Sequence, residues 1–184
     1  MKANRVVTLT SILQWEGSDL NTSPNEPGGA SKFGVSVDFL TDYHKKHGWP
    51  SATIHDVTVL TNDDAMLIYN EMLLDPLQFD VLPTGVDFRL ADLTTNSGMT
   101  GGPTLLQLCL GMFPLTGTMD NQTINLVQAI DPKALVIALS AAWIAVKHQS
   151  PNWGPHPPIT KNGFGHGWSN RNNAQRDAAL ALIK

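Results

Sequence analysis

Residues 12–36 read ILQWEGSDLNTSPNEPGGASKFGVS, and within this stretch a helical pattern gives way to a turn-rich one. Upstream, Val6, Leu9 and Leu13 recur at helical spacing, which predicts a first helix over about residues 5–14. Downstream, prolines and glycines crowd residues 17–35, and these residue types favour turns. We therefore expect a small β-hairpin or irregular lobe near the N-terminus.

The rest of the chain is mostly helical in pattern. Capping residues and apolar periodicity predict helices over about residues 36–46, 61–72, 87–96, 103–110, 122–130, 132–148 and 169–183. With the first helix, these predict a mainly α fold of about seven or eight helices. The 184 residues show no repeat or obvious linker, so we expect a single domain over residues 1–184.

Composition narrows the class of protein. A hydrophobic content of 42% with 15% charged residues is typical of a globular chain. The chain lacks a basic stripe for nucleic acid, and its most apolar segment, residues 134–146, is too short to span a bilayer. The N-terminus lacks the apolar core of a signal peptide, so we expect synthesis in the cytoplasm. We also expect the protein to be a monomer.

Glu16 is the most informative acidic residue. It lies three residues after Leu13 and seven after Leu9, hence on the apolar face of the predicted helix. It also lies at the helix C-terminus, where the macrodipole disfavours a negative charge. Burial and dipole both favour the protonated carboxyl, which a general acid in glycoside hydrolysis requires. The alternative is an exposed Glu at a frayed helix end.

Two further candidates follow in the turn-rich stretch. Glu26 precedes Pro27 and two glycines, and the sharp backbone course that they favour could hold a carboxylate across a cleft from Glu16. Ser31 could position a water molecule or contact a sugar hydroxyl. The alternative for Glu26 is an ordinary polar loop residue.

Other polar and aromatic residues have two possible roles each. Asn96 and Ser97 precede a glycine, so they either end a helix or bind an N-acetyl group. Tyr69 lies on an apolar helical face and is either core or a sugar platform. Trp153 and Trp168 flank a loop rich in Pro and Gly, and either could line a cleft.

Neither a metal nor another cofactor is expected. His44 and His47 stand three residues apart, but two lysines lie between them, which indicates a solvated helix end. The later histidines lack metal-ligand spacing and a nearby acidic motif. Cys109 lies in an apolar run without a convincing base partner, which favours a buried, inert thiol.

The stretch quoted first resembles the N-terminal signature of glycoside hydrolase family 108, lysozyme-like muramidases of phage endolysins and bacterial genomes. Its E-G step stands here as Glu16-Gly17, and its D-P-G-G-A-T step runs from Glu26 to Ser31, with Glu for Asp and Ser for Thr. Further landmarks of the family occur in order, at Ala65, Ile68, Tyr69, Asp92, Asn96-Ser97-Gly98, Leu106-Gln107, Gly117, Thr123, Gly167-Trp168 and Asn170-Arg171.

The resemblance implies a lysozyme-like fold and cleavage of peptidoglycan glycan strands at the β-1,4 bond between N-acetylmuramic acid and N-acetylglucosamine. It implies Glu16 as the catalytic acid, with Glu26 and Ser31 as the second catalytic positions. Residues 1–100 would then carry the catalytic motif, and residues 101–184 resemble a peptidoglycan-associated segment packed in the same unit.

A phage-type muramidase without a signal peptide would reach the cell wall, in the periplasm of a Gram-negative host, after holin-type release. Two other functions stay open. One is a noncatalytic peptidoglycan-binding or phage structural protein that keeps the fold. The other is a metal-dependent wall amidase or peptidase.

Overall fold

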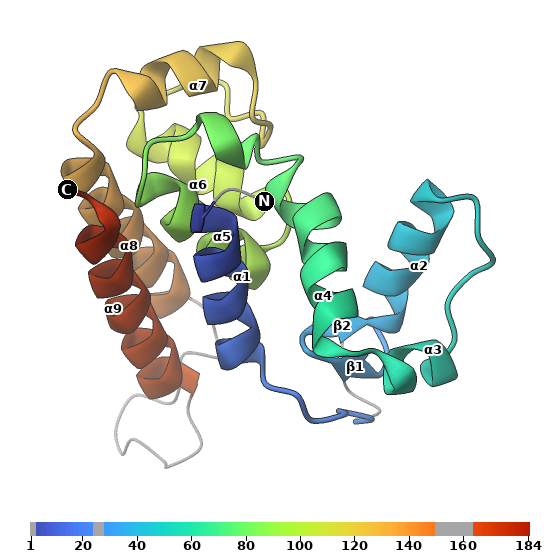
Figure 1. The fold of residues 1–184 in the computed structure, drawn as a ribbon. Helices are drawn as coiled ribbons and strands as arrows, with labels where there is room; N and C mark the ends of the chain where they lie inside the picture. The colour runs from blue at the N-terminus through green and yellow to red at the C-terminus, as the bar shows by residue number, and fades with distance from the viewer. Residues whose placement is uncertain (1–2, 24–27, 150–163) are drawn as a thin grey trace. The chain divides into compact units, whose positions relative to one another are not determined.

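The computed structural model describes residues 3–23, 28–149 and 164–184, and the chain divides into two compact units, residues 1–76 and 77–184 (Figure 1). The first unit contains α1 (Ala3–Glu16), β1 (Ser31–Lys32), β2 (Val35–Ser36), α2 (Val37–Lys46), α3 (Ile54–Val59), α4 (Asn62–Tyr69) and the π-helix η1 (Asn70–Leu74). The second contains the 3-10 helix η2 (Phe79–Val81), α5 (Val86–Ser97), α6 (Gly101–Cys109), α7 (Asn121–Gln128), α8 (Pro132–His148) and α9 (Phe164–Leu182).

The predicted fold class is confirmed: the described chain is mainly helical, with a two-stranded sheet near the N-terminus. Nine α-helices occur among the described residues, against the seven or eight expected. The additional helix is α3, whose exposed Ile54 and Val59 give no amphipathic pattern. A capping box between Thr53 and Asp56 sets its start instead.

In the first unit, α1 packs against α4 and η1. Leu9 and Leu13 are buried on one face of α1, as their helical spacing predicts, and Ile12 is buried with them. Val6, which was expected on the same face, is 44% exposed. The guanidinium of Arg5 ties α1 to η1, because its Nη1 atom donates to both the Asn70 and the Asp75 side chain at 2.7 Å. The N-terminal part of α1 is therefore held against η1, the element that follows α4.

The π-helix η1 continues α4 after Tyr69. Its wider turn is closed by a hydrogen bond of 3.1 Å from the Asp75 N–H to the Asn70 carbonyl, five residues earlier. Leu73 and Leu74 are buried in this segment. The predicted helix over residues 61–72 is thus an α-helix as far as Tyr69 and a π-helix beyond it.

The small sheet is a β-hairpin with two residues in each strand and two in the turn. Ser31 pairs with Ser36 and Lys32 with Val35, so Phe33 and Gly34 form the turn. Both have positive φ, 56° and 75°, as a tight hairpin of this length requires. Glycine adopts that conformation freely, whereas an aromatic residue rarely does.

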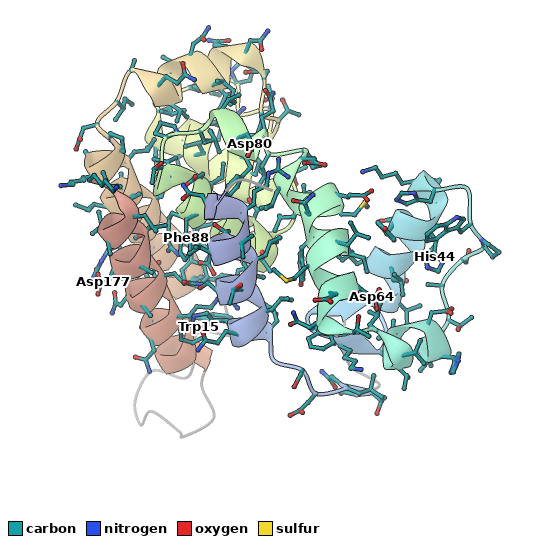
Figure 2. The ribbon with its side chains drawn as sticks, in the orientation of Figure 1. Trp15, His44, Asp64, Asp80, Phe88 and Asp177 are labelled. Atoms are coloured by element: carbon teal, nitrogen blue, oxygen red, sulfur yellow. The ribbon has the colours of Figure 1, made fainter. Side chains whose placement is uncertain are left out.

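The second unit centres on α5, which packs against α6, α8 and α9. Figure 2 labels Phe88 on this helix, and its side chain is buried. Arg89 on the same helix is also fully buried, and its Nη1 atom lies 2.6 Å from the Asp92 Oδ2 atom. The Arg171 Nε atom on α9 donates to the other oxygen of Asp92 at 3.0 Å. Burial is the main cause that lowers the pKa of Arg89 to about 10.

Buried Gln107 organises the loop after α6. Its Oε1 atom accepts from the backbone N–H groups of Thr116 and Gly117, and its Nε2 atom donates to the Thr118 carbonyl.

Within the part of the chain that the structure describes, no single helix is long and apolar enough to cross a membrane. One bent pair, α7 with α8, meets that length and composition test together.

Candidate active site

Glu16 is the last residue of α1 and is half-buried. The Gly17 N–H completes the final helical turn with a hydrogen bond of 3.0 Å to the Leu13 carbonyl, and Gly17 then leaves the helix with a φ of 76°. Figure 2 shows the neighbouring Trp15 at this end of α1, where it is 42% exposed. The carboxyl group is therefore carried on the rigid end of a packed helix.

The carboxyl group of Glu16 lies against the hairpin turn. A Cβ atom placed on Gly34 would be 2.9 Å from the Glu16 Oε2 atom and 2.5 Å from the Tyr69 Oη atom. Both distances are too short for real side-chain contacts. Gly34 thus allows the catalytic candidate and a tyrosine hydroxyl to approach the same point on the backbone.

Tyr69 contributes its hydroxyl to the turn and its ring to the core. The hydroxyl donates a hydrogen bond of 3.1 Å to the Phe33 carbonyl. The ring is 3% exposed and packs beside Phe39, with 5.8 Å between ring centroids. In this structure the ring has no open face for a sugar, so the hydroxyl is the part of Tyr69 that reaches the candidate site.

A groove of about 410 Å³ lies beside Glu16 in the first unit. Its wall includes Gly17, which follows Glu16, and Phe33, which precedes Gly34. The other residues that line it are Thr10, Leu13, Gln14, Ser18 and Asn62. No charged side chain is among these described lining residues. These polar residues carry no signal in the sequence, because their types are common on surfaces and Asn62 comes from a helix distant in sequence.

The other N-terminal candidates lie on or near the hairpin. Ser31 is in β1 and 9% exposed, and its N–H and carbonyl pair with Asn21 at 2.9 and 2.8 Å. It stands two residues before Phe33 on the hairpin that contacts Glu16. Glu26 lies outside the described residues.

The candidates from the second half of the chain all contact residues of the second unit. The Asn96 side chain donates to the Asp92 carbonyl at 2.8 Å, one helical turn earlier. The Ser97 hydroxyl accepts from the Trp143 indole at 3.2 Å. The ring of Trp168 lies 4.8 Å from the Lys147 ammonium, whose pKa is lowered by burial. The structure therefore places Asn96 and Ser97 at the end of α5 and Trp168 on α9, each with a partner in the second unit. Trp153 lies outside the described residues.

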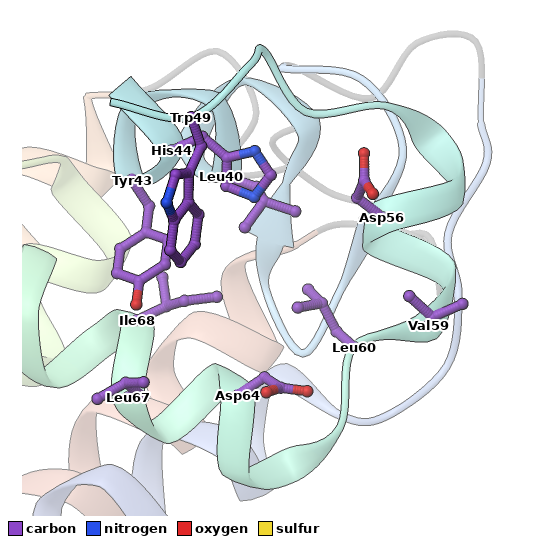
Figure 3. A pocket seen from close by; sticks show the side chains of 10 residues that line it. All are labelled: Leu40, Tyr43, His44, Trp49, Asp56, Val59, Leu60, Asp64, Leu67 and Ile68. Atoms are coloured by element: carbon purple, nitrogen blue, oxygen red, sulfur yellow. The ribbon is translucent and has the colours of Figure 1, made fainter. Parts of the chain in front are cut away.

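A second groove, of about 270 Å³, is lined by α2, α3 and α4 (Figure 3). Trp49 forms one wall and packs edge-on against Tyr43, while Asp56 and Asp64 lie on the other side. Each of these carboxylates accepts hydrogen bonds from the threonine that caps its own helix. This groove contains none of the residues proposed from the sequence, and its polar groups serve the helix ends.

Within the described part of the chain, no group of three or more His, Cys, Asp or Glu side chains could hold a metal ion. His47 instead contacts Glu71, with 2.9 Å between its Nε2 atom and the carboxylate. Among the described residues of the first unit, the Glu16 carboxyl group lies beside a groove with a neutral lining.

Comparison with known proteins places this architecture in a class. The solved structure entitled "Structure of Brucella abortus SagA" matches with a TM-score of 0.84 and 24% identity, over 100% of this chain and 98% of that chain. The fold is lysozyme-like. No curated protein matches the sequence.

A comparison with family models adds a match over part of the sequence. Residues 9–98 match the model of the family described as Glycosyl hydrolase 108, and this confirms the resemblance over a segment that includes Glu16 and the hairpin. The match supports a peptidoglycan hydrolase of the lysozyme-like type, that is, a glycosidase acting on the cell wall polymer.

Proposed function

We propose that the protein is an N-acetylmuramidase that cleaves the β-1,4 bond between N-acetylmuramic acid and N-acetylglucosamine, with Glu16 as general acid. The observation that carries this proposal is the position of the Glu16 carboxyl group. It lies against Gly34 at the hairpin turn, next to a groove with a neutral lining, within the segment that matches the glycosidase family.

Hydrolysis of the glycosidic bond requires one proton donor and one proton acceptor. Glu16 donates its proton to the glycosidic oxygen as the bond from that oxygen to the anomeric carbon breaks, and the bonding electrons leave with the oxygen. Water supplies the new hydroxyl at the anomeric carbon and gives up a proton to a carboxylate. We propose Glu26 as that second carboxylate, or as a stabiliser of the oxocarbenium-like transition state, with Ser31 orienting the water.

The test is digestion of purified peptidoglycan by the full chain. New reducing ends that mass spectrometry identifies as N-acetylmuramic acid support the proposal, whereas N-acetylglucosamine ends indicate the other glycosidic bond. Glu16→Gln should lower the rate by at least about a hundredfold. Glu71→Gln removes a carboxylate that contacts His47 and should retain activity. A fully active Glu16→Gln protein would overturn the assignment.

The same digestion separates the other functions. Binding to peptidoglycan without soluble products would indicate a noncatalytic wall-binding or structural protein, and new free amines would indicate an amidase or peptidase. We propose in addition that the protein acts as an endolysin in the periplasm after holin-type release. Expression in a Gram-negative host should then cause lysis only when a holin is co-expressed, and lysis without one would overturn this route.

A further inference from the structure

We infer that the groove beside Glu16 is a subsite for an uncharged acetamido sugar, in which Gln14 and Asn62 bind the polar groups and Phe33 packs against the ring. This inference rests on the proposed function, because it takes the ligand to be a unit of the glycan strand. Gln14 and Asn62 lie outside the motif positions that carry the family resemblance, whereas Phe33 stands where that motif has an aromatic residue.

The lining of the groove matches a neutral, polyhydroxylated ligand. Gln14, Asn62, Thr10 and Ser18 offer amide and hydroxyl groups, each of which both donates and accepts hydrogen bonds. Sugar hydroxyls and acetamido groups have the same dual character. A charged peptide would need an opposite charge, and no described side chain that lines the groove carries one.

The conformation of Phe33 gives an independent indication. Its φ of 56° is uncommon for a bulky residue, and such strain persists where the surroundings hold it and is concentrated at ligand sites. Two contacts hold Phe33 here. The Tyr69 hydroxyl binds its carbonyl at 3.1 Å, and the Lys32 ammonium lies over its ring at 5.3 Å from the centroid. Glycine at this position would relieve the strain but would remove the ring from the groove.

Two residues that line the groove are sequence neighbours of Glu16 and of the glycine that Glu16 contacts. Glu16 is followed by Gly17, which lines the groove, and Phe33 is followed by Gly34, which Glu16 contacts. The groove therefore adjoins the backbone at Gly17 and Phe33, one residue from Glu16 and one residue from the Gly34 that Glu16 contacts. The volume of about 410 Å³ is within the range of small-molecule sites, roughly 300–1,000 Å³.

The experiment measures binding in a Glu16→Gln background, so that hydrolysis does not consume the ligand. The probe is the trimer of β-1,4-linked N-acetylglucosamine, titrated by calorimetry. Gln14→Leu and Asn62→Leu should each weaken binding by about tenfold, the cost of leaving a hydrogen-bonding group of the sugar unpaired. Gln122→Leu replaces an exposed amide of the second unit and serves as the matched control with unchanged affinity.

Phe33→Gly separates a binding role from a structural one. We expect the melting temperature to stay the same or rise, because glycine accepts the positive φ, while the trimer binds more weakly. The subsite is overturned if the Gln14→Leu, Asn62→Leu and Phe33→Gly proteins bind the trimer as tightly as the Glu16→Gln parent does. It is also overturned if the parent binds the deacetylated trimer as tightly as the acetylated one.

The two proposals fail in different ways. If the Glu16→Gln protein binds the trimer through these residues but the wild type releases no reducing ends, the subsite stands and the muramidase does not. If the wild type cleaves peptidoglycan and the groove variants leave both trimer affinity and KM unchanged, the muramidase stands and the subsite is wrong.

Discussion

The hydroxyl of Tyr69 donates a hydrogen bond of 3.1 Å to the backbone carbonyl of Phe33, and so joins α4 to the hairpin turn that Glu16 contacts. Thirty-six residues separate the two partners in sequence. The bond therefore fixes a strained turn from outside the hairpin. The ring of Tyr69 is buried, so the hydroxyl is the part of this side chain that meets the turn.

The first prediction concerns that bond. Tyr69→Phe keeps the buried ring and removes the donor, so the unfolding free energy should fall by about 1 kcal/mol. If the hydroxyl positions the turn, kcat on peptidoglycan should also fall, by about tenfold, with a smaller change in KM. Denaturant unfolding and steady-state kinetics measure the two effects. Lower stability with an unchanged kcat would restrict Tyr69 to a purely structural role.

The second prediction uses the close approach at Gly34. Gly34→Ala combines an unfavourable positive φ with contacts below 3 Å to Glu16 and Tyr69, so activity should fall at least about tenfold and stability by roughly 1–3 kcal/mol. Gly48→Ala is the matched control. Gly48 has a φ of 72°, but nothing lies within 4 Å of a Cβ placed there.

The Gly48→Ala protein should thus show the backbone cost alone and retain full activity per folded molecule. If the two alanine variants have the same specific activity, the approach of Glu16 to the turn is not needed for catalysis.

The third prediction concerns the buried ion pair of the second unit. Asp92 is 2% exposed and lies between the guanidinium groups of Arg89 and Arg171. Asp92→Asn would leave the buried Arg89 charge uncompensated and should cost about 3–5 kcal/mol of unfolding free energy. Asp177→Asn breaks the more exposed pair with Arg176 and should cost less than about 1 kcal/mol. Urea denaturation of both variants decides, and similar small losses would show that the buried network is dispensable.

The fourth prediction is a dependence on pH. Hydrogen bonds from Thr61, first from its hydroxyl and then from its N–H, hold the pKa of Asp64 below its ordinary value of 3.8. A lowered folded-state pKa contributes stability that is complete above the unfolded value and is lost as the pH falls through the folded one. Between about pH 5 and about pH 3, the melting temperature of Asp64→Asn should therefore fall less steeply than that of the wild type. Parallel curves would contradict a contribution from this capping box.

Local features were predicted well from the sequence. Ser36, Thr61 and Asp131 are the N-caps of α2, α4 and α8, which begin within a residue of the predicted starts, because an N-cap depends on the neighbouring backbone alone. The first helix extends two residues further than expected at each end, and Glu16, which was expected at its C-terminus, is its last residue. Short α3 was missed, since six residues with an exposed apolar surface carry no periodic signal.

The assembly of the candidate site could not be predicted in the same way. Glu16 stands out in the sequence because a glutamate on the apolar face at the C-terminus of a helix is unusual. The groove does not, since Asn62 and Gln14 are unremarkable surface residues until α4 and α1 bring them together. The same holds for Tyr69, whose partner is fixed by tertiary packing and not by any local pattern.

The π-helical turn over Asn70–Leu74 constrains how the chain can be recombined with relatives. Such a turn accommodates an extra residue, and deletion of one would restore α-helical register and rotate Leu73 and Leu74 out of the core. It would also shift Asn70 and Asp75 relative to the Arg5 guanidinium that binds both. Chimaeras with crossover points in this segment should therefore preserve residue count through Leu74, even where the amino acids themselves are exchanged.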